Sequence, residues 1–274
     1  MIANMFHFST VFGFKRDMHL AYRTGEVIGT GGKGVVRRVT DHAGEEFACK
    51  TIPKDGTLIW KEIVAMRAMD KCPLVTQLVD VYEDRSHVHI VSELCYGGAL
   101  DNEVFAEDDV KTFMTQILLA IDAIHRADIV HRDVKPGNFV RVLSPEDRDI
   151  KAIDFGISEP LPVIDPELKG TLWYMAPEMF SSKVGPEIDV WAAGVTAVEL
   201  LTGAMPFDDR RNTRRPAVEA VVRSILLDTY VYAGDGVCAD FIAELLTRDP
   251  KRRPRADEML QHPWLTQSRL ETKN

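Results

Sequence analysis

The sequence predicts an α+β fold, with strands gathered in the N-terminal third of the chain and helices in the remainder. Between Tyr22 and Val91, short segments alternate between apolar and polar residues, which is typical of strands. From Asp109 onward, apolar residues recur at intervals of three and four, the period of a helix packed on a core. The 274 residues are enough for one large domain or two smaller lobes with their own cores.

The first pair of predicted strands, Tyr22 to Thr40, encloses a glycine-rich turn. The turn runs from Gly29 to Gly34 with the spacing G-x-G-x-x-G-x-V. Glycine has no Cβ, so the backbone N–H groups of such a turn can approach a phosphate closely. Turns of this kind are frequent in hairpins without a ligand. Here a strand follows (Val35 to Val39), which disfavours a dinucleotide-binding fold, and the absence of G-x-x-x-x-G-K-[ST] disfavours a P-loop NTPase.

The next predicted strand, Glu46 to Ile52, carries a lysine between apolar neighbours. Such a lysine is most often a surface residue whose stem packs along apolar side chains. If Lys50 is instead functional, it needs an anion to hold it. A helical run from Leu58 to Met66 follows and contains Glu62, the candidate partner.

The remaining elements follow the same two periods. Further strands and helices are predicted at residues 78–81, 87–91, 109–126, 129–130, 150–153 and 186–201. The helix from Asp109 has a single apolar stripe, which we expect to face the core. The helix that follows Pro186 is apolar on all sides, so we expect it to be buried.

Composition narrows the classes of partner. The formal net charge is −9, with 45% hydrophobic and 27% charged residues, which is ordinary for a soluble globular protein. A nucleic-acid or acidic-membrane partner would need a basic face, and the net charge argues against both. No run of about 18 apolar residues exists, so no transmembrane segment is expected.

The cysteines and the N-terminus bear on localisation. Cys49, Cys72, Cys95 and Cys238 fall inside apolar runs without metal-ligand spacing, so we expect reduced, buried thiols in an intracellular and most simply cytoplasmic protein. An organelle such as the chloroplast stays open, because the first sixteen residues contain no acid and faintly resemble a transit peptide. They lack an Arg-rich amphipathic pattern, so an ordered extension that packs on the domain is favoured.

The stretch His131 to Asn138 (HRDVKPGN) carries an acid, a cation and an amide on one tight loop. Asp133 is followed by Lys135 and then by Asn138, and the signature Asp154-Phe155-Gly156 comes shortly afterwards. A hydroxyl nucleophile, an anionic transferring group and a divalent cation need such groups close together. DFG alone occurs by chance, whereas the whole motif with DFG at this distance is a specific signal.

This order of motifs resembles the protein kinases. HRDVKPGN and DFG are similar to the kinase catalytic loop and metal-binding motif, and the glycine-rich turn and Lys50 precede them as in that family. The resemblance covers about residues 22–265. It implies a bilobal fold, with a small antiparallel sheet and one main helix in residues 22–94 and a larger, mainly helical lobe in residues 95–265. Residues 1–21 are then an N-terminal extension, and residues 266–274 are a polar C-terminal tail.

The resemblance also implies chemical roles. Asp133 would accept the proton of a substrate hydroxyl or orient that hydroxyl, and Lys135 would neutralise charge on the moving γ-phosphoryl group. Asn138 and Asp154 would bind Mg²⁺, for which Mn²⁺ can substitute. Lys50 would hold the α/β-phosphates of ATP, and Glu62 would hold Lys50. The interval between Lys50 and Glu62 is short for this family.

ATP is the implied nucleotide, with its adenine edge paired to backbone groups of Glu93 and Cys95 in the linker between the lobes. Ser92 stands where many kinases carry a bulky residue, which predicts an enlarged pocket behind the adenine. The residues expected around ATP are Gly29, Thr30, Gly31, Gly32, Lys33, Gly34, Val36, Ala48, Lys50, Glu93, Cys95 and Val140.

The segment after DFG ends in Gly170 to Glu178, GTLWYMAPE, which together with Lys135 resembles serine/threonine kinases and departs from tyrosine kinases. Arg132 needs an anion to hold this segment in place, and in many kinases that anion is a phosphothreonine. Glu167 stands at the corresponding position here. We expect its carboxylate to replace the phosphate and to give activity without phosphorylation of the segment. A solvated acidic loop is the alternative.

The resemblance implies two further contacts in the helical lobe. We expect Asp189 to brace the HRDVKPGN loop from below and Arg253 to pair with Glu178. Gly137 and Ala99 replace acids that commonly read basic residues of a substrate. These two replacements predict a weaker preference for arginine upstream of the target site.

Within the kinases, the segments around residues 152–160, 185–207 and 248–264 look most like the calcium/calmodulin-dependent group, and closest to the plant and algal calcium-dependent kinases. No EF-hand loop is present in the sequence. We therefore expect either a catalytic fragment or a kinase without calcium control.

The predicted function is an ATP-dependent serine/threonine protein kinase. Its expected partners are ATP and a protein that offers a serine or threonine hydroxyl, and a monomer is expected. The alternative is a pseudokinase scaffold that binds partners without catalysis, and the intact lysine, aspartates and asparagine of the motifs favour the enzyme. A small-molecule kinase on the same fold is disfavoured by the GTLWYMAPE segment, which is typical of peptide docking.

Overall fold

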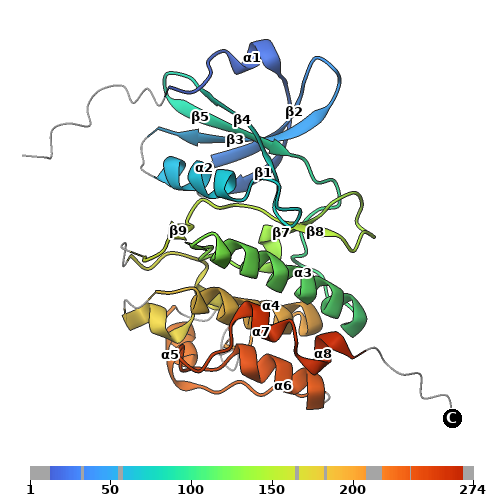
Figure 1. The fold of residues 1–274 in the computed structure, drawn as a ribbon, viewed down its shortest axis with the longest axis vertical. Coiled ribbons are helices and arrows are strands. Elements are labelled where there is room, and N and C mark those ends of the chain that lie inside the picture. Colours follow the sequence, from blue (N-terminus) through green and yellow to red (C-terminus); the bar gives the residue numbers. More distant parts are fainter. Residues whose placement is uncertain are drawn as a thin grey trace, which may run out of the picture.

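The protein has two lobes, as the sequence predicts. The computed structural model describes residues 13–31, 34–54, 58–163, 167–181, 184–207, 218–234 and 236–267. Figure 1 shows a sheet with α1 and α2 in the upper lobe and a group of helices in the lower lobe. This arrangement confirms the predicted α+β, bilobal fold. Within the described residues, no helix combines the length and the apolar character that a membrane span requires.

An antiparallel sheet of five strands forms the N-terminal lobe, in the order β1-β2-β3-β5-β4. The strands are β1 (Arg23–Gly31), β2 (Gly34–Thr40), β3 (Glu46–Pro53), β4 (Leu78–Glu83) and β5 (His87–Glu93). They coincide with the predicted strands. In β2 the exposure alternates along most of the strand, as expected when successive side chains point to opposite faces. In β3, Cys49 joins a buried cluster with Tyr22 and Tyr82, while its neighbour Lys50 faces the opposite side.

Two helices cover this sheet. Helix α2 (Leu58–Ala68) contributes Ile59 and Ile63 to the main core, in the same cluster as Val88 and Ile90 of β5. Helix α1 (Met18–Ala21) precedes β1, and its Met18 packs against the cluster around Cys49. Each face of the sheet therefore carries a cluster of buried side chains against which one of the two helices packs.

Two long helices form the centre of the C-terminal lobe. Helix α3 (Glu107–Arg126) buries the whole predicted stripe, which consists of Val110, Phe113, Met114, Ile117, Leu118, Ile121 and Ile124. Helix α4 (Glu187–Thr202) is buried along most of its length, as its apolar sequence predicts. It ends at Gly203, whose φ of +68° lies in the left-handed region that favours glycine at a helix end.

Short elements complete this lobe and the junction with the sheet. The remaining helices are α5 (Val218–Leu227), α6 (Gly236–Leu245), α7 (Ala256–Met259) and α8 (Pro263–Thr266). Two small antiparallel pairs lie nearer the upper lobe (Figure 1), β6 (Ile129–Val130) with β9 (Glu159–Pro160) and β7 (Phe139–Arg141) with β8 (Ile150–Ala152). Residues 131–138, called the HRD loop below, run from β6 to β7 and end in a 3₁₀ turn, Pro136–Asn138.

A buried carboxylate holds the HRD loop against α4, as predicted. Asp189 of α4 accepts hydrogen bonds from the backbone N–H groups of His131 and Arg132, both at 2.8 Å, and its Oδ2 lies 2.9 Å from His125 Nε2. Burial opposes ionisation of Asp189, but these donors outweigh burial and lower the pKa of Asp189 below its usual value. The charged carboxylate therefore fixes the start of the loop.

A second predicted pair connects the end of the chain to the segment after DFG. Arg253 Nη1 and Nη2 lie 2.6 and 3.1 Å from the two carboxylate oxygens of Glu178. Arg253 Nη1 also donates to the carbonyl of Glu187 at the start of α4 (2.8 Å). A buried, bidentate pair of this kind fixes the relative orientation of the two side chains as well as their distance.

Candidate active site

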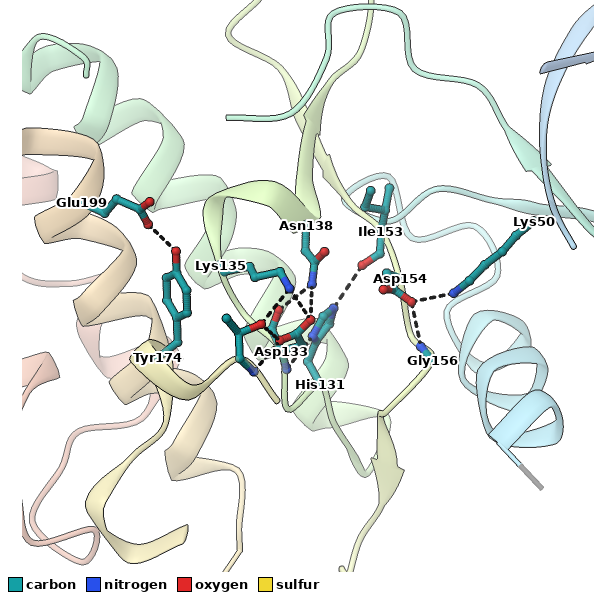
Figure 2. A network of polar contacts seen from close by, with 11 residues as sticks. Lys50, His131, Asp133, Lys135, Asn138, Ile153, Asp154, Gly156, Tyr174 and Glu199 are labelled. Atoms are coloured by element: carbon teal, nitrogen blue, oxygen red, sulfur yellow. Dashed lines mark hydrogen bonds and ion pairs between the residues drawn. The ribbon is translucent and has the colours of Figure 1, made fainter. Parts of the chain in front are cut away.

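The first part of the site is a lysine held by two carboxylates. Lys50 Nζ lies 2.6 Å from Glu62 Oε1 and 2.6 Å from Asp154 Oδ1. Strand β3, helix α2 and the segment after β8 each supply one of these residues (Figure 2 shows the Lys50–Asp154 contact). Burial disfavours the charged form of Lys50, but the two carboxylates outweigh it and raise the pKa of Lys50 above its usual value. Lys50 is therefore a cation, and the short connection to α2 does not prevent its pairing with Glu62.

Asp133 is the centre of the HRD loop (Figure 2). Its Oδ2 accepts hydrogen bonds from Lys135 Nζ at 2.7 Å and from Asn138 Nδ2 at 3.0 Å. Its Oδ1 accepts from the backbone N–H and the hydroxyl of Thr171, at 3.0 and 2.7 Å. Burial opposes ionisation, but these donors outweigh it and lower the pKa of Asp133. Asp133 is thus an ionised carboxylate that already binds a hydroxyl group.

The two predicted metal ligands lie on adjacent segments. The N–H of Ile153, the residue before Asp154, donates to the backbone carbonyl of Asn138 at 2.9 Å. Asn138 Nδ2 donates to the backbone carbonyl of Asp133 (2.6 Å) and to its carboxylate, which leaves the amide oxygen of Asn138 to face a cation. Asp154 has a φ of +59°, a left-handed conformation that is costly for a residue other than glycine and often marks a functional site.

The donor set at Asn138 and Asp154 fits magnesium. Mg²⁺ is usually bound by one or two protein oxygens and keeps water and phosphate oxygens as its other ligands. In the described part of the chain, no group of three or more His, Cys, Asp and Glu side chains could hold a metal ion by itself. An amide oxygen and a carboxylate therefore suit an ion that arrives with a nucleotide better than a permanent structural metal.

The HRD loop and the DFG segment are also joined by their side chains. His131 Nε2 lies 3.3 Å from the carbonyl oxygen of Ile153, and the His131 ring lies 5.1 Å from the ring of Phe155. Phe155 is buried in the main core cluster, which also contains Met66 of α2. Leu78 of β4 packs against the same cluster. These contacts connect the two sides of the site through apolar packing.

The glycine-rich turn is described on both sides of its tip. The register pairs Gly29 with Val36, Thr30 with Val35 and Gly31 with Gly34. Gly34 has a φ of +155°, and a Cβ there would lie 2.2 Å from the carbonyl oxygen of Thr51 in β3, so this position requires glycine. Gly32 and Lys33, predicted to contact ATP, lie outside the described residues.

The other residues predicted around ATP come from both lobes. Ala48 of β3 is paired with Ser92 of β5, and β5 ends at Glu93, where the linker that carries Cys95 begins. The Glu93 carboxylate is bound by Lys151 Nζ at 2.5 Å, and the Glu93 N–H donates to the Gln77 carbonyl at 2.9 Å. From the C-terminal lobe, Val140 of β7 forms an isolated bridge with Ala99.

The prediction that the Glu167 carboxylate holds Arg132 is wrong. Arg132 Nη2 donates to the backbone carbonyl of Glu167 at 2.6 Å, whereas the Glu167 carboxylate pairs with Lys169 and is 72% exposed. The carboxylate that lies beside the Arg132 guanidinium is that of Glu159, at 3.6 Å. The spacing of the sequence correctly predicted that Arg132 contacts the chain at Glu167. It did not predict that the Glu167 side chain points outward.

Glu159 is a residue that the sequence analysis missed. It lies in β9, is buried, and pairs with Lys61 of α2 as well as with Arg132. Lys61 is the neighbour of Glu62, and Arg132 is the neighbour of Asp133. The sequence did contain a signal for Glu159. It is an acid five residues after Asp154, and elsewhere in the sequence Arg132 and Lys61 each need an anion.

A second missed pair lies on the other side of Asp133. Tyr174 donates a hydrogen bond from its hydroxyl to Glu199 Oε2 of α4 at 2.5 Å (Figure 2). Burial raises the pKa of the Glu199 carboxyl, and the negative charge of Asp101 adds to this effect. A Cβ on Gly137 would lie 3.8 Å from the Asp101 carboxylate. Acidic groups therefore flank the HRD loop even though Gly137 itself carries none.

Comparison with known proteins agrees with this geometry. The family described as "Protein kinase domain" matches residues 22–265. Calcium-dependent protein kinase 29 of Arabidopsis thaliana is 33% identical over 94% of this chain and 51% of its own length. Calcium-dependent protein kinase 7 of the same plant is 36% identical over 91% of this chain and 49% of its own. Calcium-dependent protein kinase 20 of Oryza sativa subsp. japonica is 34% identical over 91% and 48%.

The chain spans about half the length of these curated relatives. The family match nevertheless covers all the elements from β1 to the start of α8, including every residue of the Lys50 and Asp133 clusters. These identities confirm the predicted resemblance to the calcium-dependent kinases. The chain belongs to the protein kinase family.

Proposed function

We propose that this chain is a serine/threonine protein kinase that transfers the γ-phosphoryl group of Mg–ATP to serine and threonine hydroxyls of proteins. The observation that carries the proposal is the assembly of Lys50, Glu62, Asp133, Asn138 and Asp154 into one hydrogen-bonded site drawn from both lobes. Residues 22–265 form the catalytic domain in this proposal, because they contain all of these groups. Residues 1–21 and 266–274 are its extensions.

In this proposal, each residue of the site has a separate role in the reaction. Asp133 holds the acceptor hydroxyl and takes or directs its proton, a role that contributes roughly 10²–10⁴-fold to a rate. Lys135 balances the charge on the transferred group, and Lys50, kept cationic by Glu62, holds the α/β-phosphates. Bound between Asn138 and Asp154, magnesium would supply charge neutralisation for the phosphates. Positioning and electrostatics thus account for the chemistry.

The contacts of Thr171 support a hydroxyl acceptor. Its hydroxyl donates to Asp133 Oδ1 at 2.7 Å and accepts from Lys135 Nζ at 2.8 Å. An acid and a cation already arranged around one aliphatic hydroxyl are suited to a serine or threonine side chain in the same region. Lys135 and the sequence GTLWYMAPE, both typical of serine/threonine kinases, support the same choice.

We further propose that activity does not require phosphorylation of the segment after DFG. The Arg132 side chain is 0% exposed, so none of it is open to a phosphate on this segment. Its Nη2 donates to the carbonyl of Glu167, and its Nη1 lies 3.6 Å from the Glu159 carboxylate without a hydrogen bond. Between Asp154 and Gly170 the sequence contains one hydroxyl residue, Ser158. Ser158 is 1% exposed and donates its hydroxyl to the carbonyl of Phe155 at 2.7 Å, so it is not accessible to another kinase.

Phosphoamino-acid analysis tests the main proposal. The chain is incubated with Mg²⁺ and γ-labelled ATP, together with a mixture of unstructured acceptor proteins, and the labelled residues are identified. We expect label on serine and threonine. A protein that binds Mg–ATP in a calorimeter but transfers no label would be a pseudokinase scaffold, and label confined to tyrosine would contradict the choice of acceptor.

Phosphatase treatment tests the second proposal. The chain is treated with a broad-specificity phosphatase, its unphosphorylated state is verified by mass spectrometry, and its initial rate is measured before autophosphorylation can proceed. We expect the rate to equal that of the untreated chain. A treated chain that is inactive until it is phosphorylated again would overturn the proposal.

A further inference from the structure

The segment before β1 lies outside the family match and packs on the N-terminal lobe. Residues 13–21, called the N-terminal arm below, end where the match at residue 22 begins. The arm runs along β4, the edge strand of the sheet: Lys15 forms a parallel bridge with Tyr82, and the Glu83 N–H donates to the Lys15 carbonyl at 2.8 Å. The arm therefore covers a strand edge that would otherwise present unpaired backbone groups.

A buried carboxylate connects the arm to the segment that leads into α2. Glu83 Oε1 accepts a hydrogen bond from the Gly13 N–H at 3.1 Å, and Glu83 Oε2 accepts from Lys54 Nζ at 2.7 Å. Lys54 follows β3 directly, on the side toward α2. Glu83 is buried and both contacts are partly buried, so removing one partner is costly.

The arm touches α2 itself through an aromatic contact. The rings of Phe14 and Trp60 lie 5.2 Å apart at an angle of 56°. Trp60 lies in α2, two residues before Glu62, and is 41% exposed. Phe14 packs partly buried against the main core cluster, to which Ile59 and Ile63 of α2 belong. Phe14 therefore packs against the helix that carries Glu62.

The other end of the arm touches β3 beside Lys50. Met18 of α1 lies against Cys49, with 3.6 Å between the two sulfur atoms. Cys49 is the chain neighbour of Lys50, and the two side chains lie on opposite faces of the sheet. Figure 1 shows α1 at the top of this lobe and α2 at its lower left, separated by the strands. The arm thus contacts both elements that make the Lys50–Glu62 pair.

We infer that the N-terminal arm is a positioning element of the kinase site, and that Phe14 is the residue through which it holds α2 in the orientation that pairs Glu62 with Lys50. The inference rests on the proposed function for its catalytic consequence. Without the Phe14 ring, α2 loses an aromatic contact beside Glu62, and the helix is freer to turn Glu62 away from Lys50. Lys50 then binds the phosphates in a less fixed position, which lowers the rate of transfer.

The kinetic test uses the full chain with Phe14→Ala, Phe14→Leu and Leu20→Ala. Leu20 lies on the same arm but its side chain is 66% exposed, so Leu20→Ala is the matched control. We expect Phe14→Ala to lower kcat by about tenfold, Phe14→Leu to restore most of the rate, and Leu20→Ala to match the wild type. A Phe14→Ala chain with unchanged kcat would overturn the inference.

A double-mutant cycle shows whether Phe14 acts through the ion pair. If it does, Phe14→Ala should change kcat little in a chain that already carries Glu62→Gln. Equal effects of Phe14→Ala with and without Glu62→Gln would mean that Phe14 acts by another route, which would contradict the inference.

Hydrogen exchange separates this inference from the proposed function. The amides of α2 are followed in the wild type, Phe14→Ala and Leu20→Ala, without nucleotide. We expect faster exchange in α2 of the Phe14→Ala chain only, whether or not the protein transfers phosphate. Unchanged exchange in α2 would overturn the positioning role, whereas a failure of the proposed function appears as absent transfer in the wild type.

Discussion

Asp189 is the single residue on which the geometry of the HRD loop depends most. It is buried, ionised, and bound to two backbone N–H groups of the loop and to His125. We expect Asp189→Asn to lower the free energy of unfolding at pH 7 by about 3 kcal/mol, because one side-chain oxygen that accepts these bonds is lost. Urea unfolding measures this. Asp122→Asn on α3, which removes an exposed pair with Arg126, is the control and should cost little.

The Asp189 effect should depend on pH in a defined direction. Its pKa in the folded state is lower than in the unfolded state, so its contribution to stability is complete above the unfolded pKa of about 4 and is lost as the pH falls below it. The difference in melting temperature between wild type and Asp189→Asn should therefore shrink between pH 7 and pH 3.5. A difference that grows on acidification would contradict the account.

Ser92 gives a second test at the scale of one residue. It lies in β5 opposite Ala48, and the predicted pocket behind the adenine depends on its small side chain. We expect a pyrazolopyrimidine inhibitor with a bulky C3 substituent to bind the wild type at least about tenfold more tightly than Ser92→Met, as measured by competition with ATP. Equal affinity for both chains would exclude the enlarged pocket.

The partner of a charged residue was predictable where both residues belong to recognised motifs. The pairings of Lys50 with Glu62 and of Arg253 with Glu178 follow from motif order, because each partner belongs to a motif whose place in this fold is known. The contact of Arg132 was assigned to the wrong acid, because the side-chain direction in an irregular segment depends on its path through space. Spacing along the sequence carries no information about that path.

At the scale of elements, β9 and α2 are joined by the Lys61–Glu159–Arg132 contacts. We expect Glu159→Gln to lower kcat by about tenfold and to cost about 1–3 kcal/mol of stability, because it leaves Arg132 and Lys61 without the shared carboxylate. Initial rates and urea unfolding check this. Glu167→Gln is the matched control on the same segment, and its exposed carboxylate should be dispensable. A loss of activity in Glu167→Gln alone would restore the original interpretation.

The longer elements were predictable from their period, whereas the two-residue strand β9 was not predicted. Helix α3 and strands β1 to β5 have runs long enough for an apolar pattern to repeat. Strand β9 consists of Glu159 and Pro160, and its pairing with β6 is set by the fold around it. A two-residue strand has no period, so tertiary contacts alone decide it.

At the scale of the whole molecule, the two-lobed arrangement was predictable because the motifs occur in a fixed order along the chain. The sequence also favoured an ordered N-terminal extension over a transit peptide. The described part of that extension does pack on the lobe, through Phe14 and Met18. Where it packs was not predictable, since Phe14 and Lys15 belong to no repeating pattern and their partners on α2 and β4 are distant in sequence.

The central claim is that both lobes assemble one site for phosphoryl transfer. The most direct measurement is the initial rate of label transfer from γ-labelled Mg–ATP to a serine-containing acceptor by the wild type, Asp133→Asn and the control Asp122→Asn. We predict that Asp133→Asn retains nucleotide binding but transfers at least about 10²-fold more slowly, while Asp122→Asn matches the wild type. Equal rates for Asp133→Asn and the wild type would contradict the account.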